Sequence, residues 1–272
     1  MPTSDSPADL PFAPPGQPAA GSLAREDGTV LAYYKTKAGK ASSEKAAAAP
    51  GVIFLGGFMS DMTGGKATAL EAWAQRRGRD FVRFDYRGHG ASSGRFAEAT
   101  IGDWAGDAIA VLDRLTEGPQ ILVGSSMGGW IMLLAALARP QRIAALVGIA
   151  AAPDFTEDLI WARATPEQRH ALETVGHVDN PSAYSATPYR ITRRLIEEGR
   201  NHLLLRGPIA LACPVRLIHG LEDVDVPWQT SLRLADALAS GDVEVTLVKG
   251  AAHRLSEPAD LARLERVIET LS

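Results

Sequence analysis

Residues 124–128 constrain the fold of this chain more than any other segment. They read Gly-Ser-Ser-Met-Gly, follow the apolar run 121–123, and lead directly into the helix-forming run 129–136. This order predicts a strand, a tight turn and a helix, with Ser126 at the tip of the turn. A serine hydroxyl is a weak nucleophile until geometry and a neighbouring base activate it, and a strained elbow of this form holds the Oγ atom clear of the backbone. We therefore predict that Ser126 is a catalytic nucleophile.

A second match to the same pattern shows how much the context matters. Residues 90–94 read Gly-Ala-Ser-Ser-Gly, but the apolar strand before them, residues 81–86, ends too early, and no apolar helix follows Ser92. We interpret this segment as a loop. Asp85 and His89 belong to the same glycine-rich turn, where turn hydrogen bonds explain them better than catalysis does.

The chain order supplies an acid and a base for Ser126. In the strand-elbow-helix architecture the nucleophile is followed by the acid and then by the histidine. Asp223 lies in the turn after the apolar strand 215–219, and His253 is the only histidine beyond it, just after the alternating strand 243–248. Imidazole titrates near neutrality, so His253 would take the serine proton and return it to the leaving group, while Asp223 would orient the ring.

Two backbone N–H groups are expected to form an oxyanion hole. One belongs to Met127, the residue after the nucleophile, and the other comes from the loop after an early central strand. Residues 52–55 read as that strand, and the loop that follows begins Gly56-Gly57-Phe58. We place the second donor at Phe58.

Several stretches of this sequence resemble one family within the α/β-hydrolase superfamily. They are residues 83–94, 117–130, 138–141, 213–214 and 226–228. These stretches look like the mitochondrial palmitoyl-protein thioesterase also called mycophenolic acid acyl-glucuronide esterase. The resemblance implies an α/β-hydrolase fold, a triad of Ser126, Asp223 and His253, and an esterase or thioesterase that acts on acyl groups. It does not specify the substrate of this chain.

The order of expected elements predicts an α/β fold in one main unit. Strands and helices alternate along the chain, which is typical of a mostly parallel central sheet flanked by helices on both faces. We assign residues 23–152 and 213–272 to this core, and residues 1–22, rich in Pro, Ala, Ser and Gly, to a flexible tail. A second flexible stretch, residues 37–50, is expected to link an early hairpin to the first central strand.

Residues 153–212 interrupt the alternation and predict a helical cap over the site. A capping-box pattern begins at Thr165, with proline at the first helical position, and residues 188–198 are a second candidate helix. Candidate pocket residues are Trp130, Phe155 and Trp161. Two alternatives stay open. The insertion is a surface hairpin without catalytic consequence, or its large apolar residues only attach it to the core instead of lining a pocket: Phe155, Ile160, Trp161, Leu195 and Ile196.

Composition excludes several classes of protein. The net charge of −4 gives no basic field for nucleic acid, and no apolar run is long enough to span a bilayer. The single cysteine and the absence of an H-E-x-x-H pattern argue against a metal site, and we expect no cofactor. His219 is interpreted as structural. Residues 1–22 lack an apolar signal region, and Asp5 and Asp9 argue against a transit peptide, so we expect a cytoplasmic protein.

These features together predict a serine hydrolase of esters, thioesters or acyl-glucuronides that works through an acyl-enzyme on Ser126. Its substrate would be a small molecule or an acylated partner, and the oligomeric state is not predicted. Two alternatives remain. The same scaffold supports carbon–carbon bond hydrolysis or acyl transfer, and a receptor can retain the triad yet turn over slowly.

Overall fold

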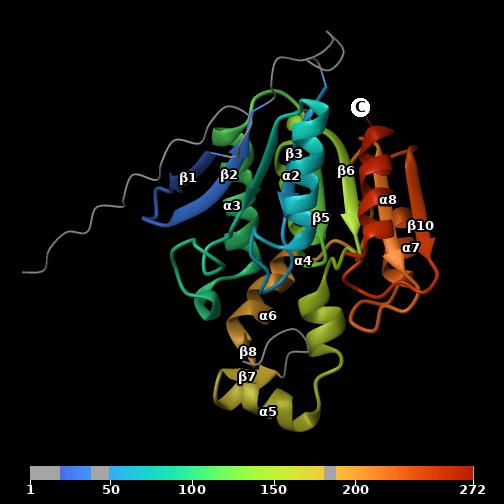
Figure 1. The fold of residues 1–272 in the computed structure, drawn as a ribbon. Coiled ribbons are helices and arrows are strands. Elements are labelled where there is room, and N and C mark those ends of the chain that lie inside the picture. The colour runs from blue at the N-terminus through green and yellow to red at the C-terminus, as the bar shows by residue number, and fades with distance from the viewer. Residues whose placement is uncertain (1–18, 38–48, 181–187, 272) are drawn as a thin grey trace, which may run out of the picture.

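The computed structural model describes residues 19–37, 49–180 and 188–271 of the 272-residue chain. Its centre is an eight-stranded sheet in the order β1-β2-β4-β3-β5-β6-β9-β10 (Figure 1). β1 pairs antiparallel with β2, and β2 with β4, whereas all the other neighbours are parallel. The strands are β1 (Ala19–Ala24), β2 (Val30–Thr36), β3 (Gly51–Leu55), β4 (Phe81–Phe84), β5 (Gln120–Ser125), β6 (Ile143–Ile149), β9 (Val215–Gly220) and β10 (Val243–Val248).

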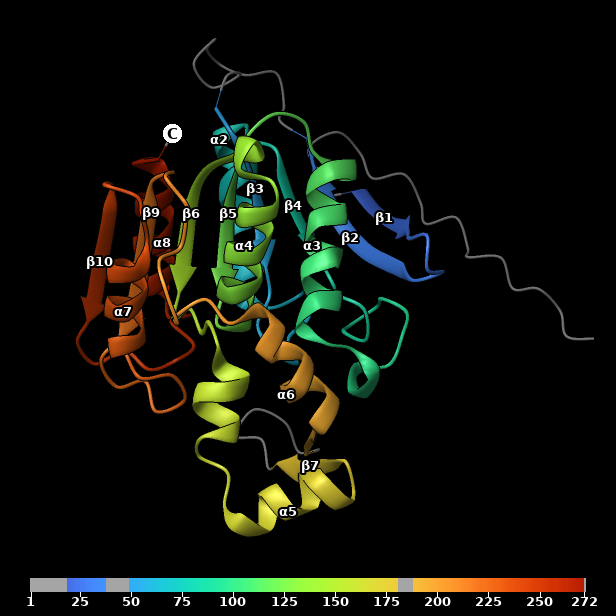
Figure 2. The same cartoon turned by 180° about the vertical axis from the view of Figure 1, so that it is seen from behind.

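Helices cover both faces of this sheet, which explains why β3, β4 and β5 are buried along their whole length. On one face lie α2 (Gly65–Arg77) and α8 (Pro258–Glu269), and on the other lie α3 (Ile101–Leu115), α4 (Met127–Ala138) and α7 (Gln229–Ala237) (Figures 1 and 2). Two buried apolar clusters correspond to the two faces. The predicted α/β fold with a mostly parallel, helix-flanked sheet is confirmed.

Between β6 and β9 the chain leaves the sheet and builds a cap below it (Figure 2). The cap consists of a π-helical segment η3 (Thr156–Trp161), α5 (Pro166–Thr174), β7 (His177–Asn180), β8 (Tyr189–Thr192), α6 (Arg193–Gly199) and a 3₁₀ turn η4 (Arg200–His202). Helix α5 starts as its sequence predicts. The Thr165 hydroxyl accepts from the Gln168 N–H at 3.2 Å, and the Gln168 side chain accepts from the Thr165 N–H at 3.0 Å.

The second helix expected in this insertion, over residues 188–198, is wrong in its first half. There the chain forms β8, which pairs with β7 in an antiparallel hairpin that sets Ile191 opposite Val178. Ile191 is fully buried, and α6 begins only after Thr192, whose hydroxyl accepts from the Leu195 N–H at 3.1 Å. Aromatic and β-branched side chains favour a strand at this point. The cap therefore mixes helices with a hairpin and is not wholly helical.

Hydrogen bonds tie the two ends of the cap to each other and to the core. Asp154, at the start of the insertion, is buried with a backbone φ of 61°. Its carboxylate accepts from the N–H groups of Leu204 and Leu205, at 2.7 and 2.9 Å, near the other end of the insertion. The Glu198 carboxylate of α6 accepts from the Gly102 N–H, in the first turn of α3, at 3.2 Å.

The expected tail boundary is too late. Residues 1–18 lie outside the described part of the chain, but residues 19–22 belong to β1, where they pair with β2. Small residues such as Ala19 have a low intrinsic strand propensity, so pairing with β2 is what stabilises this strand. The linker expected over 37–50 falls mostly on residues 38–48, which also lie outside the described residues. None of the helices that the structure describes is both long and apolar enough to cross a membrane.

Candidate active site

Ser126 stands at a sharp elbow between β5 and α4. Its backbone has φ 53° and ψ −119°, a positive-φ conformation outside the allowed regions that residues with a side chain normally adopt. The backbone around it is fully used: the Ser126 N–H donates to Ile149 O at 2.9 Å, and the Ser126 carbonyl accepts from Gly129 and Ala152. Strain of this kind persists only where the surrounding structure enforces it.

Two glycines make the elbow sterically feasible. A Cβ atom on Gly128 would lie 2.1 Å from Leu55 O, and one on Gly124 would lie 2.4 Å from Gly128 O. Neither distance is tolerable, so a side chain at either position would push α4 away from β3 and β5. The glycines of the pattern are thus required by close backbone approach rather than by flexibility alone.

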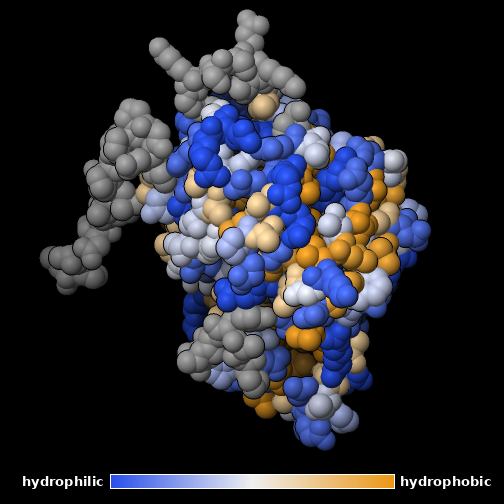
Figure 3. Space-filling model, turned by 45° about the vertical axis from the view of Figure 1, so that its right-hand side comes forward, coloured by the Kyte–Doolittle hydropathy of each residue, from blue (hydrophilic) through white to orange (hydrophobic). Residues whose placement is uncertain are grey.

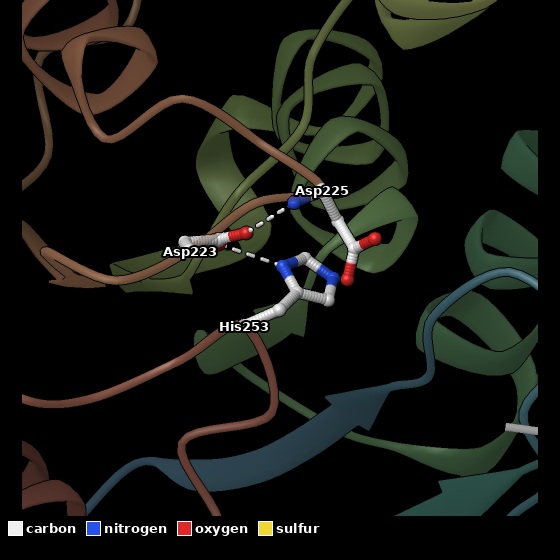
Figure 4. A group of neighbouring side chains, drawn as sticks. All are labelled: Asp223, Asp225 and His253. Atoms are coloured by element: carbon white, nitrogen blue, oxygen red, sulfur yellow. Dashed lines mark hydrogen bonds and ion pairs between the residues drawn. The ribbon is translucent and has the colours of Figure 1, made fainter. Parts of the chain in front are cut away.

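The structure brings Ser126, Asp223 and His253 into one hydrogen-bonded chain. His253 Nε2 lies 3.0 Å from Ser126 Oγ, and His253 Nδ1 lies 2.7 Å from Asp223 Oδ2. The serine comes from the elbow, the aspartate from the turn after β9, and the histidine from the loop after β10. Figure 4 shows His253 beside Asp223. The Asp223 side chain is fully buried and that of His253 is 16% exposed, so the base faces the solvent side of the chain.

Four donors surround the Asp223 carboxylate. Oδ1 accepts from the N–H groups of Asp225 and Val226, at 2.9 and 2.8 Å, while Oδ2 faces both His253 and His219. Burial alone would raise the pKa of Asp223. The hydrogen bonds from His219, His253 and the Val226 N–H, together with the charge of His253, instead hold this pKa well below its ordinary range.

Asp225 lies on the other side of the His253 ring from Asp223 (Figure 4). Ligand atoms of Asp223, Asp225 and His253 lie within 4.8 Å of one another, so these three residues are the group that could hold a metal ion among the described residues. A metal there would compete with the hydrogen bonds that join His253 to Asp223 and to Ser126. The absence of a metal site therefore stays a prediction.

The loop after β3 lies against the nucleophile. A Cβ atom placed on Gly57 would be 3.5 Å from Ser126 Cβ, and Phe58, Ser126 and Met127 all line the same cavity. Met127 is the first residue of α4, where an N–H has no partner within the helix. The oxyanion hole formed by the N–H groups of Phe58 and Met127 stays a prediction, with which this placement is compatible.

Two buried side chains brace the far end of this loop at Met62. The Met62 N–H donates to Asp85 Oδ1 at 2.6 Å, and the Met62 carbonyl accepts from Arg83 Nη1 at 2.9 Å. Asp85 Oδ2 accepts in turn from the Ala91 N–H at 2.8 Å. Asp85 thus joins the loops after β3 and β4, which agrees with its structural interpretation.

Ser92, the serine of the second match to the elbow pattern, has a structural role. Ser92 Oγ donates to Asp85 O at 2.6 Å and accepts from the Ala32 N–H at 2.8 Å, so its hydroxyl ties the turn to β2. His89 is buried among Tyr86, Phe96 and Trp104. Neither side chain belongs to the hydrogen-bonded chain around Ser126.

A cavity of about 830 Å³ opens over Ser126 and His253, at the carboxyl ends of the parallel strands, where ligands bind in folds of this kind. The space-filling view shows apolar surface at the junction of core and cap (Figure 3). The apolar lining from the cap comes from Phe155, Leu159, Ile160, Leu172, Val178 and Tyr189. Lys66 and Arg163 are cationic residues of the same lining, and burial lowers the pKa of Lys66 to about 8.

Phe155 lines this cavity as expected, but Trp130 does not. Trp130 is fully buried on α4, its indole N–H donates to His202 O at 3.0 Å, and its ring packs edge-on against Phe155 from behind. It therefore holds η4 against the core. Its position directly after the elbow suggested a pocket residue, but a helix turns about 100° per residue and sends this side chain away from the site.

Trp161 is also absent from the cavity lining. Its half-buried ring packs against the core and contacts the guanidinium groups of Arg169 and Arg200, at 5.2 and 5.1 Å from the ring centroid. The neighbouring Ile160 and Leu159 line the cavity instead. Cation–π contacts with the two arginines help to hold the tryptophan ring in this position.

Residues that the sequence interpretation missed lie in the cap and behind the acid. Leu159 and Tyr189 line the cavity, and only their apolar character within the insertion could have indicated them. His219 and Ser231 continue the hydrogen bonds of Asp223. His219 lies near the end of β9, four residues before Asp223, and this spacing could have indicated the contact.

Comparisons with known proteins agree with this fold. Residues 50–194 match the family model described as serine aminopeptidase, S33. The mitochondrial palmitoyl-protein thioesterase ABHD10 of Mus musculus is 47% identical over 223 residues, which cover 82% of this chain and 75% of the relative.

Two solved structures are also similar. Mouse α/β hydrolase domain-containing protein 10 superposes with a TM-score of 0.83 at 42% identity, covering 93% of this chain and 98% of that one. A putative hydrolase from Agrobacterium vitis S4 superposes with a TM-score of 0.86 at 38% identity, covering 94% and 98%.

The fold and these similarities define the chain as an α/β-hydrolase, and it is a hydrolytic enzyme. Within that class it belongs to the family of the ABHD10 palmitoyl-protein thioesterases. The family resemblance drawn from the sequence is confirmed. The mouse relative is named as mitochondrial, so the expectation of a cytoplasmic protein gains no support from it.

Proposed function

We propose that this chain hydrolyses acyl esters and thioesters through an acyl-enzyme on Ser126. The observation that carries the proposal is the unbroken hydrogen-bonded chain from Ser126 through His253 to Asp223, on a strained elbow beneath a partly apolar cavity. A nucleophile within hydrogen-bond reach of a base, itself oriented by a third group, is the signature of nucleophilic catalysis.

Acylation would begin with attack of Ser126 Oγ on the acyl carbonyl carbon, while His253 Nε2 accepts the serine proton. Asp223, bonded to His253 Nδ1, would stabilise the resulting imidazolium. The oxyanion would accept hydrogen bonds from the N–H groups of Phe58 and Met127. Collapse of the tetrahedral intermediate would break the bond to the alcohol or thiol, which leaves with the proton from His253.

Deacylation would repeat these steps with water as the nucleophile. His253 would remove a proton from the water as it attacks the acyl carbonyl, and it would return that proton to Ser126 Oγ as the carboxylic acid leaves. His253 is partly exposed to the cavity, so water can reach its Nε2 face.

The cavity supports an acyl chain as the part of the substrate that is recognised. Leu159, Ile160 and Val178 give the cap side an apolar lining suited to hydrocarbon. The ABHD10 relatives are named as palmitoyl-protein thioesterases, and we extend to this chain the chemistry of acyl-thioester hydrolysis. Ester and acyl-glucuronide substrates share the same carbonyl chemistry.

Labelling and turnover together test the proposed function. The wild-type chain should react with a fluorophosphonate probe at Ser126, located by peptide mapping, and should turn over p-nitrophenyl esters and an acyl-thioester continuously. Labelling at another residue would contradict the mechanism. Binding of acyl ligands with negligible steady-state turnover would identify a receptor on the same scaffold.

Cytoplasmic localisation is a further part of the proposal. It stands against a mitochondrial location, which the names of the ABHD10 relatives give for those proteins. Fractionation of cells that carry the tagged chain would test it, and recovery in an organelle would contradict it.

A further inference from the structure

The acid of the proposed triad is shared by two histidines. His219 is the last residue but one of β9 and is fully buried. Its Nε2 atom lies 3.0 Å from Asp223 Oδ2, the same oxygen that faces His253, and 3.0 Å from Val226 O. Its Nδ1 atom lies 2.7 Å from the hydroxyl of Ser231, a buried residue of α7. The hydrogen-bonded chain thus runs from Ser126 to Ser231.

The partners of His219 assign its hydrogen atoms. The Val226 carbonyl can only accept a hydrogen bond, and an ionised Asp223 can only accept, so the proton must reside on Nε2 and be shared between them. In the neutral ring Nδ1 is then an acceptor, and the Ser231 hydroxyl donates to it. Ser231 therefore favours the one neutral tautomer that presents an N–H to Asp223.

This contact completes the coordination of the Asp223 carboxylate. Its two oxygens have about four acceptor sites, and four donors occupy them: two backbone N–H groups on Oδ1 and the two histidines on Oδ2. The two backbone donors fix one oxygen. His219 is the side chain that, together with His253, holds the other oxygen.

We propose that His219, held by Ser231, is a positioning residue that keeps Asp223 aimed at His253. The inference rests on the proposed function, because it assigns His219 a role in the same reaction. His219 touches neither the substrate cavity nor Ser126, so its effect would pass through Asp223 alone. Loss of its N–H would let the Asp223 carboxylate group rotate, so that Oδ2 moves out of line with His253 Nδ1.

A pair of substitutions separates this role from simple filling of space. His219→Leu fills the site without a donor, whereas His219→Gln retains an N–H close to the position of Nε2. We expect His219→Leu to lower kcat by about 10- to 100-fold, the range seen when outer partners of active-site groups are removed, with KM changed less than twofold. His219→Gln should recover most of the loss.

Spectroscopy gives a readout that a purely structural role would not move. The His253 Nδ1–H bonded to Asp223 should give a low-field proton resonance in the wild type and in His219→Gln, and this signal should be shifted or lost in His219→Leu. Ser231→Ala should lower kcat by about three- to tenfold, and Ser231→Thr should restore it. Thr230→Ala, on the same helix, controls for the loss of a buried hydroxyl.

The outcomes distinguish this inference from the proposed function. If the wild type turns over esters in a Ser126-dependent way while folded His219→Leu retains full kcat and the low-field signal, the inference is overturned and the proposed function stands. If His219→Leu does not fold, Ser231→Ala decides alone, and a kcat within twofold of the parent overturns the inference. If the wild type shows no turnover, the proposed function itself has failed.

Discussion

Ser126 has a backbone conformation that costs a residue with a Cβ atom on the order of 1–3 kcal/mol. The cost is offset by backbone hydrogen bonds to Ile149, Gly129 and Ala152, none of which involves the serine hydroxyl. Because the backbone alone sets the elbow, the hydroxyl is free to serve His253. A substitution that removes only the hydroxyl oxygen of Ser126 therefore tests the nucleophile without disturbing the elbow.

Ser126→Ala should abolish hydrolysis and leave the fold intact. We expect kcat to fall by several orders of magnitude, since the substitution removes the nucleophile and no backbone contact. Turnover of a p-nitrophenyl ester, with the thermal unfolding midpoint measured in parallel, checks this. Ser92→Ala is the matched control: it should retain activity while losing the hydrogen bonds to Asp85 and Ala32. The opposite ranking would mean that the elbow is misassigned.

Asp223→Asn should cripple turnover, whereas Asp225→Asn should be mild. An amide at 223 disfavours the His253 tautomer that accepts from Ser126, which costs roughly 10³- to 10⁴-fold in kcat. Asp225 contributes its backbone N–H to Asp223, and that group survives the substitution. We expect its kcat to stay within about fivefold. The measurement is kcat of both folded variants. A larger loss in Asp225→Asn than in Asp223→Asn would mean that Asp223 is not the acid.

Two adjacent residues of η3 have different surroundings. Ile160 lines the cavity, whereas Trp161 is not part of the lining and contacts two arginines. Sequence alone could not separate them, since both are large and apolar within one short segment. The direction of each side chain depends on the phase of the helix, which Phe155 and the buried Asp154 fix by packing against the core.

Ile160→Ala should shift the preferred acyl chain to greater length. Each methylene buried in the enlarged pocket contributes on the order of 0.8 kcal/mol, so kcat/KM should peak one or two carbons later than in the parent. A homologous p-nitrophenyl ester series measures the profile. Trp161→Ala, the neighbouring residue, should leave the optimum in place. A shift of the optimum in Trp161→Ala but not in Ile160→Ala would mean that Trp161, and not Ile160, limits the length of the pocket.

Local signals in the sequence predicted the elements that local interactions determine. The capping box at Thr165, the elbow glycines and the strand that ends before Asp223 all depend on neighbours in sequence, and the structure contains each of them. The start of β1 at Ala19 and the strand at Ile191 depend on pairing with distant segments. Such pairing leaves little trace in the local sequence. The predicted tail boundary and the first half of the second predicted cap helix are therefore wrong.

The same limit applies to the site at the scale of the whole molecule. The order of Ser126, Asp223 and His253 along the chain indicated the three residues, because a parallel sheet brings the ends of its strands together. The cavity above them forms where the cap meets the core, and its lining is set by tertiary packing. Sequence alone therefore assigns Trp130, an apolar residue beside the elbow, to the pocket, although its indole N–H bonds to η4 and its ring does not line the cavity.

Lys66 connects this cavity to the stability of the whole fold. It lies in the first turn of α2, its ammonium donates to Arg254 O, and burial lowers its pKa from 10.5 to about 8, with the charge of Arg254 acting in the same direction. Between pH 8 and 10.5 the unfolded chain holds this proton and the folded chain does not. The free energy of unfolding contributed by Lys66 therefore rises with pH in that window.

Lys66→Met should remove this pH dependence. Below pH 8 the folded parent carries a desolvated charge that the variant lacks. From pH 8 upward the parent should gain stability relative to Lys66→Met, by on the order of 1 kcal/mol per pH unit. Denaturant unfolding of both chains from pH 7 to 10 measures the difference, with Lys249→Met as the control for loss of an exposed lysine. Parallel curves for parent and Lys66→Met would show that the cavity does not desolvate this ammonium group.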